Sequence, residues 1–272
     1  MSPRFDSDAV AALIREVAET EVRPFFRHLS AHQIREKSRG DFVTDVDEAV
    51  ERSLTQSLAA LLPGSTVVGE EAVEADRSVL DRFRTDAPVW VIDPIDGTSN
   101  FARGEPTYAI MVGLVHRNET LAGWIYDPEG DVMAVAERGA GTLLDGRPAR
   151  LAPGGTPAEM RGSLHGNGFA DARLVQRVSQ RRDRVQAQRS LRCAGHEYLK
   201  LLRGEMDFTL FTKTKPWDHV PGALMQIEAG GTALKTDGST YLATDFKVPQ
   251  GILAAPDRAS WESLREALLG EA

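Results

Sequence analysis

The amino-acid sequence predicts an α+β protein in which helices and sheets are stacked in layers. Apolar residues recur at helical spacing near the N-terminus, alternate as in strands through the middle of the chain, and return to helical spacing in the second half. With 272 residues, of which 42% are hydrophobic, the chain can bury one large core or two modest ones.

Two amphipathic helices are expected at the N-terminus. The first covers Asp6 to Leu29, where Pro24 introduces a kink or a break. The second begins at a cap formed by Thr44 or Asp45 and ends at Pro63-Gly64.

Strands are expected in the middle of the chain. The β-branched run Thr66 to Val68 predicts a short strand, and Val89 to Ile92 predicts a buried strand that ends at Asp93-Pro94. Alternating apolar residues from Tyr108 to about Val135 predict an antiparallel meander. Gly139 to Pro148 is rich in turn-forming residues and is expected to be a loop.

The second half of the chain is less regular. Turn-forming residues just after Leu151 suggest two subdomains, an N-terminal α+β part at 1–150 and a C-terminal α/β part at 151–272, that form one compact unit. Glu197 to Leu202 and Val220 to Ala229 predict helices, and Phe208 to Phe211 predicts a strand.

Composition excludes several classes of protein. A net charge of -8 argues against a general nucleic-acid binder, which would need basic residues to neutralise phosphates, and favours a small-molecule partner. The single cysteine, Cys193, rules out an internal disulfide and a CxxC-type site. Neither a secretory signal nor a membrane-spanning apolar run is visible, so a cytoplasmic location is expected.

Acidic residues gather at four places where helices or strands are expected to begin or end. These are Asp41 to Asp47, Glu70-Glu71, Asp93 to Asp96, and Asp218. Each cluster alone is also compatible with a solvated turn or a helix cap. Because Mg²⁺ prefers carboxylate and carbonyl oxygens and keeps positions for water and phosphate, the four together predict a magnesium site.

The segment that starts at Asp93 offers ligands for both a cation and an anion. The buried strand delivers Asp93, and the proline after it turns the chain so that Asp96 curls back and the Ile95 carbonyl is exposed. Gly97 permits a close backbone approach, and a helix start at Thr98 could hold a phosphate with its N–H groups.

Four motifs resemble the signatures of the inositol monophosphatase family, which belongs to the magnesium-dependent, lithium-sensitive phosphatases. They are Asp41 to Asp47 (DFVTDVD), Gly69-Glu70-Glu71, Asp93 to Phe101 (DPIDGTSNF) and Trp217 to Gly231 (WDHVPGALMQIEAGG), in the family's order and with similar spacing. The resemblance implies a layered αβαβα sandwich of the sugar-phosphatase type. It also implies homodimers and the hydrolysis of a small phosphorylated metabolite with two or three Mg²⁺ ions.

Carried over position by position, the resemblance also implies a set of metal ligands. These are Glu70, Asp93, Asp96, Asp218 and the carbonyl of Ile95. Asp96 and Asp218 would also border the substrate.

The resemblance assigns catalytic roles to a second set of residues. Asp47 and Thr98 would form the pair that activates the attacking water, and Glu70 would help to hold that water. The backbone N–H groups of Gly97 and Thr98 would bind the phosphate. Catalysis would consist mainly of neutralising and positioning the phosphate charge.

One departure from the inositol pattern bears on the choice of substrate. Phe211 stands six positions before Trp217, where inositol-specific members commonly carry a glutamate for the ring hydroxyls. Without that acceptor other substrates stay open: another polyol or sugar phosphate, fructose 1,6-bisphosphate, histidinol phosphate, or a 3'(2'),5'-bisphosphate nucleotide. Thr212 to Lys215 could contact a second anionic group or form a solvated basic loop.

Residues around this pocket have structural interpretations as well. His219 is expected to be structural or to lie at the rim, because adjacent helical residues point in different directions. Cys193 is expected to be buried and inert, in a region that, with His196, shapes the substrate pocket in relatives.

Arg173 to Arg192 contains seven arginines. The segment could contact a phosphate-rich substrate, a second subunit, or RNA or polymerase, since some bacterial relatives act as transcription partners. It could also be a solvated face. A regulatory, transcription- or RNA-associated protein with residual phosphatase activity is therefore the alternative from another class. The complete set of acidic residues argues against it.

Overall fold

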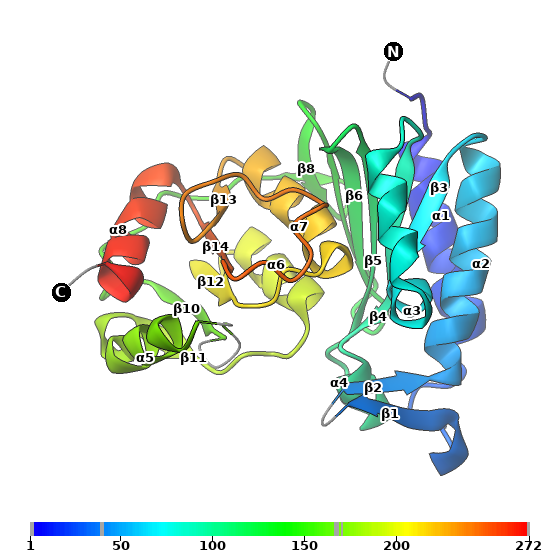
Figure 1. The fold of residues 1–272 in the computed structure, drawn as a ribbon, viewed down its shortest axis with the longest axis horizontal. Helices are drawn as coiled ribbons and strands as arrows, with labels where there is room; N and C mark the ends of the chain where they lie inside the picture. The colour runs from blue at the N-terminus through cyan, green and yellow to red at the C-terminus, as the bar shows by residue number, and fades with distance from the viewer. Residues whose placement is uncertain (1–2, 39–40, 166–168, 170, 271–272) are drawn as a thin grey trace.

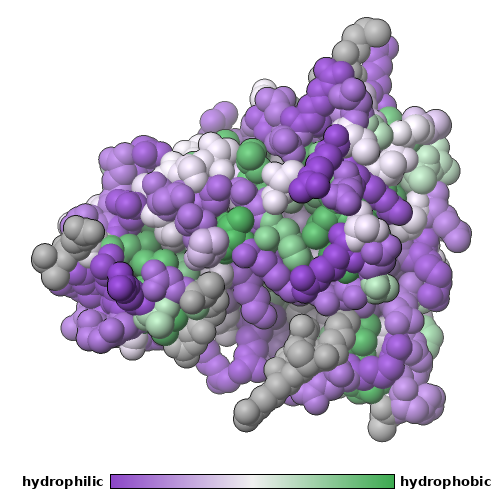
Figure 2. All heavy atoms as spheres, in the orientation of Figure 1, coloured by the Kyte–Doolittle hydropathy of each residue, from purple (hydrophilic) through white to green (hydrophobic). Residues whose placement is uncertain are grey.

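The computed structural model describes residues 3–38, 41–165, 169 and 171–270, without the side chains of residues 31, 37, 38 and 41 (Figure 1). Helices and sheets alternate along the long axis: a helical layer, a sheet, two central helices, a second sheet and an outer helical layer. This arrangement confirms the predicted αβαβα sandwich. Much of the surface in Figure 2 is hydrophilic, with hydrophobic residues visible near the middle of this face.

The first helical layer contains α1 (Ser7–Val17) and α2 (Asp45–Leu61). Asp6 caps α1, and the Thr44 side chain caps α2, as predicted. The helical region after α1 continues as a π-helical turn (Ala18–Val22) and ends two residues before Pro24. The predicted helix to Leu29 was therefore too long, because proline lacks the N–H that would continue the helical hydrogen bonds.

The apolar faces of α1 and α2 pack on a seven-stranded sheet with the order β3-β4-β5-β6-β7-β8-β9. β3 and β4 are parallel, and every later neighbour is antiparallel. The strands are β3 (Thr66–Gly69), β4 (Val89–Asp96), β5 (Ala109–His116), β6 (Glu119–Asp127), β7 (Val132–Glu137), β8 (Gly141–Leu144) and β9 (Arg147–Ala149).

Two predictions for this sheet were wrong in extent. β4 does not end at Asp93 but continues to Asp96, because its register with β5 shifts between these two residues and absorbs the turn at the proline. The segment expected to be a loop, Gly139 to Pro148, contains β8 and most of β9, which form a hairpin whose turn residues suit a tight connection as well as a loop. The predicted meander from Tyr108 to Val135 is confirmed as β5, β6 and β7.

The central helices α6 (Ala194–Leu202) and α7 (Pro216–Glu228) lie between the two sheets. The second sheet is mixed, with the order β11-β10-β12-β14-β13. Its strands are β10 (Arg161–Leu164), β11 (Gln186–Gln188), β12 (Phe208–Phe211), β13 (Thr232–Lys235) and β14 (Ile252–Ala255). One apolar cluster joins residues of the first sheet, both helices and the second sheet. The predicted division into two subdomains at residue 150 stays a prediction.

Smaller elements complete the described chain. They are β1 (Ile34–Ser38), β2 (Asp41–Thr44), α3 (Glu70–Ala75), α4 (Thr98–Ala102) and the 3-10 turns Ala31–Gln33, Arg77–Arg84 and Arg182–Arg184. Within the described residues, no helix is both long and apolar enough to cross a membrane.

The outer layer explains part of the arginine-rich segment. α5 (Ala172–Gln180) packs beside α8 (Arg258–Leu269). Arg177 donates to the carbonyl of Leu269 at 2.7 Å, Arg181 donates to the carbonyl of Gly270, and Arg184 donates to the carbonyl of Ala267 at 3.3 Å. These arginines satisfy carbonyls at the end of α8, where positive charge is favourable.

The double variant Arg177→Ala/Arg181→Ala is expected to be less stable than the parent protein. Each lost charge-assisted hydrogen bond should cost about 1 kcal/mol, so the double variant should lose about 2 kcal/mol and its Tm should fall by roughly 4–8 °C. Thermal unfolding followed by circular dichroism measures the change. Arg173→Ala is the control, because Arg173 is exposed on the same helix. Equal melting curves for both variants would show that the contacts with α8 contribute nothing.

Candidate active site

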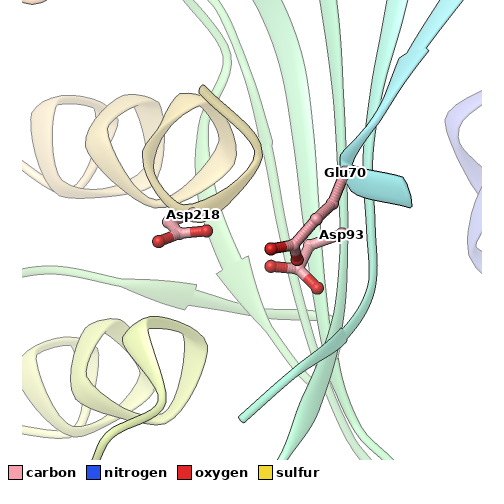
Figure 3. A group of neighbouring side chains, drawn as sticks. All are labelled: Glu70, Asp93 and Asp218. Carbon is pink, nitrogen blue, oxygen red and sulfur yellow. The ribbon is translucent and has the colours of Figure 1, made fainter. Parts of the chain in front are cut away.

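Three acidic side chains from separate elements converge at the end of the first sheet (Figure 3). Gly69 of β3 pairs with Ile92 of β4 in parallel register, so Glu70 and Asp93 follow at the same edge. Asp218 reaches them from the first turn of α7. Glu70, Asp93 and Asp218 each offer a carboxylate oxygen within 4.8 Å of the others.

The electrostatics of this acidic cluster favour a bound cation. Asp93 is buried, and its Oδ1 has no hydrogen-bond partner among the described residues. Burial, followed by the charges of Glu70, Asp96 and Asp218, raises its pKa well above the usual value. Burial also raises the pKa of Asp218 to about 7, although Lys215 opposes the rise. Carboxylate oxygens are the ligands that hard divalent cations prefer, and a bound cation would give the buried Asp93 Oδ1 a partner.

Lys215 lies at the same end of the cleft. Its Nζ forms an ion pair with Glu70 Oε1 at 2.6 Å. This contact joins the segment before α7 to the start of α3.

Asp96 and Ile95 border the acidic cluster but have other contacts. Asp96 Oδ2 accepts hydrogen bonds from the Gly195 N–H at 2.6 Å and from Cys193 Sγ at 3.0 Å, which attaches it to the start of α6. The Ile95 carbonyl lies 2.9 Å from Thr98 Oγ1. Asp96 is not among the three converging carboxylates, so its role as a ligand, like that of Ile95, stays a prediction.

The predicted catalytic pair is in contact. Thr98 Oγ1 lies 3.0 Å from Asp47 Oδ1. The other oxygen of Asp47 accepts the Thr44 N–H at 2.8 Å and the Thr44 hydroxyl in a capping box. Burial raises the pKa of Asp47 to about 6, and the hydrogen bonds from Thr44 and Thr98 limit the rise.

Gly97 connects β4 to α4 in a conformation that requires glycine. Its φ is 88°, in the left-handed region, and a Cβ there would lie 2.9 Å from the carbonyl oxygen of Thr107. The turn places Thr98 at the first position of α4.

One buried acid that orients the site was missed by the sequence analysis. Glu51 accepts the N–H groups of Glu71 at 2.8 Å and Ala72 at 2.9 Å, and thereby fixes the start of α3 and with it Glu70. Burial raises the pKa of Glu51 to about 7. A Cβ on Gly69 would come within 2.3 Å of the Glu51 carboxyl group. The available signal was the place of Glu51 beside the apolar stripe of α2.

A cleft of about 450 Å³ extends from the acidic cluster to the second sheet. Phe211 of β12 is buried in its wall, with ring centroids 5.2 Å from His165 and 4.7 Å from His219. His219 is buried, and burial lowers its pKa to about 3, so it is neutral. Its Nε2 lies 2.8 Å from the Lys213 carbonyl, in agreement with a structural role.

The raised pKa values predict how stability depends on pH. A carboxyl with a raised pKa binds protons more tightly in the folded protein than in the unfolded chain. For Asp218, raised from 3.8 to about 7, and Asp47, raised to about 6, the metal-free protein therefore loses stability as pH rises from about 4 to about 7.

Thermal unfolding with EDTA or with Mg²⁺, at about pH 5.5 and about pH 8, tests this dependence. We expect the Tm of the EDTA-treated protein to fall by several degrees at the higher pH. Mg²⁺ should reverse the fall, because it binds the deprotonated carboxylates. Equal effects of Mg²⁺ at both pH values would contradict the expectation.

The layered fold and the acidic cleft define the class of protein, an α+β sandwich of the sugar-phosphatase type. The chain belongs to the inositol monophosphatase family, whose sequence profile matches residues 5–271. It is 32% identical over 222 residues to inositol monophosphatase 2 of Solanum lycopersicum, covering 79% of this chain and 82% of the relative.

Two further relatives carry a different name. The chain is 30% identical over 232 residues to the Nus factor SuhB of Xylella fastidiosa, covering 79% of this chain and 76% of the relative. The crystal structure of the extragenic suppressor protein suhB from Bartonella henselae superposes with a TM-score of 0.80 at 22% identity, covering 97% of this chain and 98% of that one. The likeness to that structure shows the shared fold.

Proposed function

We propose that this protein hydrolyses a small phosphate monoester with the help of divalent cations, for which Mg²⁺ is the expected ion. The convergence of Glu70, Asp93 and Asp218 within 4.8 Å is the observation that carries the proposal. The family and the relative named as an inositol monophosphatase support the reaction class.

The three carboxylates would hold the cations, and Asp96 and the Ile95 carbonyl would complete the ligand set. Bound there, the ions supply charge neutralisation for the phosphate and lower the pKa of water. The Oδ1 of Asp93, which has no hydrogen-bond partner in the described part of the chain, is free to act as such a ligand.

The chain's own residues would handle the proton of the attacking water. Thr98 Oγ1, at 3.0 Å from Asp47 Oδ1, can donate to this carboxylate while it accepts from the water. With a pKa of about 6, Asp47 is largely ionised at neutral pH and can accept the proton. Glu70 would help to position the water. The N–H groups of Gly97 and Thr98, at the start of α4, would bind the phosphate.

A regulatory role is the second candidate function, because one relative is named a Nus factor. The arginine-rich segment gives it little support. Arg177, Arg181 and Arg184 are directed at carbonyls of the last turn of α8 and at Gly270 after it. The acidic cluster is not required for such a role.

A phosphate-release screen tests the proposed function. Purified protein is assayed with Mg²⁺ or EDTA on inositol, sugar, polyol, histidinol and nucleotide phosphates. We expect release that depends on Mg²⁺ for at least one monoester, with Asp86→Asn, an exposed acid, as the control variant. If no phosphate is released from any of these compounds and calorimetry detects no Mg²⁺ binding, the regulatory role is favoured.

A further inference from the structure

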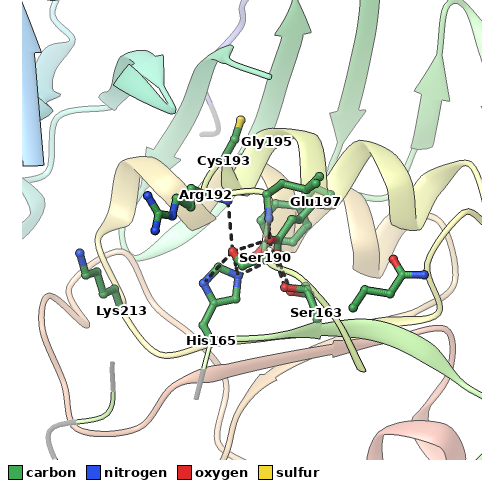
Figure 4. A network of polar contacts seen from close by, with 12 residues as sticks. Ser163, His165, Ser190, Arg192, Cys193, Gly195, Glu197 and Lys213 are labelled. Atoms are coloured by element: carbon green, nitrogen blue, oxygen red, sulfur yellow. Dashed lines mark hydrogen bonds and ion pairs between the residues drawn. The ribbon is translucent and has the colours of Figure 1, made fainter. Parts of the chain in front are cut away.

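Besides the acidic cluster, the cleft carries basic side chains from three segments, which we call the basic wall (Figure 4). His165 follows β10, Arg192 precedes α6, and Lys213 lies between β12 and α7. All three line the same cleft as Asp93 and Asp218. A phosphate ester bound at the acidic cluster would therefore have basic groups within reach of its alcohol portion.

This basic wall is built on a buried carboxylate. Glu197 is inaccessible to solvent and accepts five hydrogen bonds from residues that the structure describes. The donors are Ser163 Oγ at 3.1 Å, His165 Nε2 at 2.8 Å, Ser190 Oγ at 3.0 Å, the Leu191 N–H at 3.0 Å and Thr209 Oγ1 at 2.7 Å. Burial alone would raise the pKa of Glu197, but His165, Thr209 and Leu191 outweigh it and lower the pKa. The ionised carboxylate thus fixes the His165 ring, which keeps a face toward the cleft.

The two other basic residues are anchored through their backbones. The Arg192 N–H donates to Ser190 Oγ at 3.1 Å, and Ser190 in turn donates to Glu197. Arg192 also has a φ of 55°, a left-handed conformation that is uncommon for arginine. The Lys213 carbonyl is held by His219 Nε2 at 2.8 Å. Both side chains are exposed at the mouth of the cleft, while their backbones are fixed.

Other charged groups lie near the basic wall. Lys215 is paired with Glu70 and so belongs to the acidic end. The charge of Lys213 lowers the pKa of Asp218. The pKa of the exposed Glu105 is lowered mainly by Arg103, and the charge of Arg192 contributes to that lowering. Among the described residues, neither Asp218 nor Glu105 forms an ion pair with Lys213 or Arg192. Phe211, next to His165, presents an aromatic ring on the basic wall.

We propose that the alcohol portion of the substrate carries a second anionic group, a carboxylate or a phosphate, bound by Arg192 and Lys213 beside His165. This inference rests on the proposed function, because the ester phosphate is taken to bind at the acidic cluster. A guanidinium binds the two oxygens of a carboxylate or phosphate in parallel, and lysine adds a point charge. An uncharged polyol would offer neither Arg192 nor Lys213 an anionic partner.

Matched phosphate esters that differ in one group test the proposal. 6-Phosphogluconate is compared with glucose 6-phosphate for the carboxylate, and fructose 1,6-bisphosphate with fructose 6-phosphate for the phosphate. We expect kcat/KM for at least one doubly anionic ester to exceed that of its partner by about 10- to 100-fold. The pair with the larger ratio identifies the anionic group. Equal or better hydrolysis of both singly anionic esters would overturn the proposal and leave the phosphatase function intact.

Substitutions on the basic wall give a second test. Arg192→Gln and Lys213→Met should each raise KM for the doubly anionic ester by about tenfold, with kcat and the hydrolysis of the matched ester nearly unchanged. Arg189→Gln is the control, because Arg189 is exposed nearby but does not line the cleft. Equal effects on both esters of a pair would contradict the assigned role.

Binding of the product alcohol extends the test to a protein that shows no hydrolysis. In ligand-observed NMR without metal, gluconate or fructose 1-phosphate should bind, and glucose and fructose should not. Arg192→Gln should remove that binding. If none of these ligands binds the parent protein, the proposal fails.

Discussion

Replacing Asp93 by Asn is expected to lower kcat by at least about 100-fold. Asp93 is the buried member of the acidic cluster, and its Oδ1 has no hydrogen-bond partner among the described residues. Asparagine keeps the shape of the side chain but removes the charge that would hold a divalent cation. Phosphate release is measured over a range of Mg²⁺ concentrations. If the Asp93→Asn protein were as active as the parent and still responded to Mg²⁺, the assignment of the metal site would be wrong.

The same variant has a predicted effect on stability, which separates loss of function from loss of fold. The charges of Glu70, Asp96 and Asp218 all disfavour an ionised Asp93. Without metal, Asp93→Asn should therefore be at least as stable as the parent protein, and it should gain less from added Mg²⁺. The matched control Asp86→Asn, at an exposed position, should change neither activity nor the response to Mg²⁺. A strongly destabilised Asp93→Asn protein would argue for a structural role.

Replacing Asp47 by Asn is expected to lower kcat by about 100-fold with little change in KM. An amide still accepts the Thr98 hydroxyl but cannot take up a proton. In the parent protein, kcat should fall as pH drops through about 6, where Asp47 becomes protonated. The variant should lose this dependence on pH. A series of kcat measurements between about pH 5 and about pH 8 gives both results.

Asp45→Asn is the control for the Asp47 variant. Asp45 begins the same helix, but its side chain is 53% exposed and pairs with Arg35. It should keep full activity, and the thermal stability of both variants should be compared because Asp47 also contributes to the capping box of α2. A pH profile of kcat that is the same in Asp47→Asn and in the parent would exclude Asp47 as the proton acceptor.

Local patterns predicted much of the fold. Thr44 caps α2 as expected, because a threonine before an amphipathic run can satisfy the first backbone N–H groups. Two helices of the second half were predicted, but their first residues were placed too late. α7, for example, begins at Pro216 and not at Val220, because proline suits the first turn of a helix. α8 and strands β10, β13 and β14 were not predicted.

The candidate site was predictable where residues lie at the ends of regular elements. Glu70 follows β3 and Asp93 lies near the end of β4, and the parallel pairing of these strands brings the two residues together, where Asp218 of α7 joins them. Glu51 and Glu197 could not be found in this way. Their roles depend on partners distant in the chain, such as the Glu71 N–H and His165, and no local periodicity encodes such contacts.

The contact between Lys215 and Glu70 joins positions that are 145 residues apart. Asp218 follows closely on Lys215, so a cation shared by Asp218 and Glu70 would act as a reversible cross-link that closes a loop of similar length. Because the cation would bind these carboxylates only where folding brings them together, it would stabilise the contact between the two segments by its binding free energy. Without the ion, helix α7 should therefore detach from the first sheet more often, in a local opening that requires less free energy than the unfolding of the whole protein.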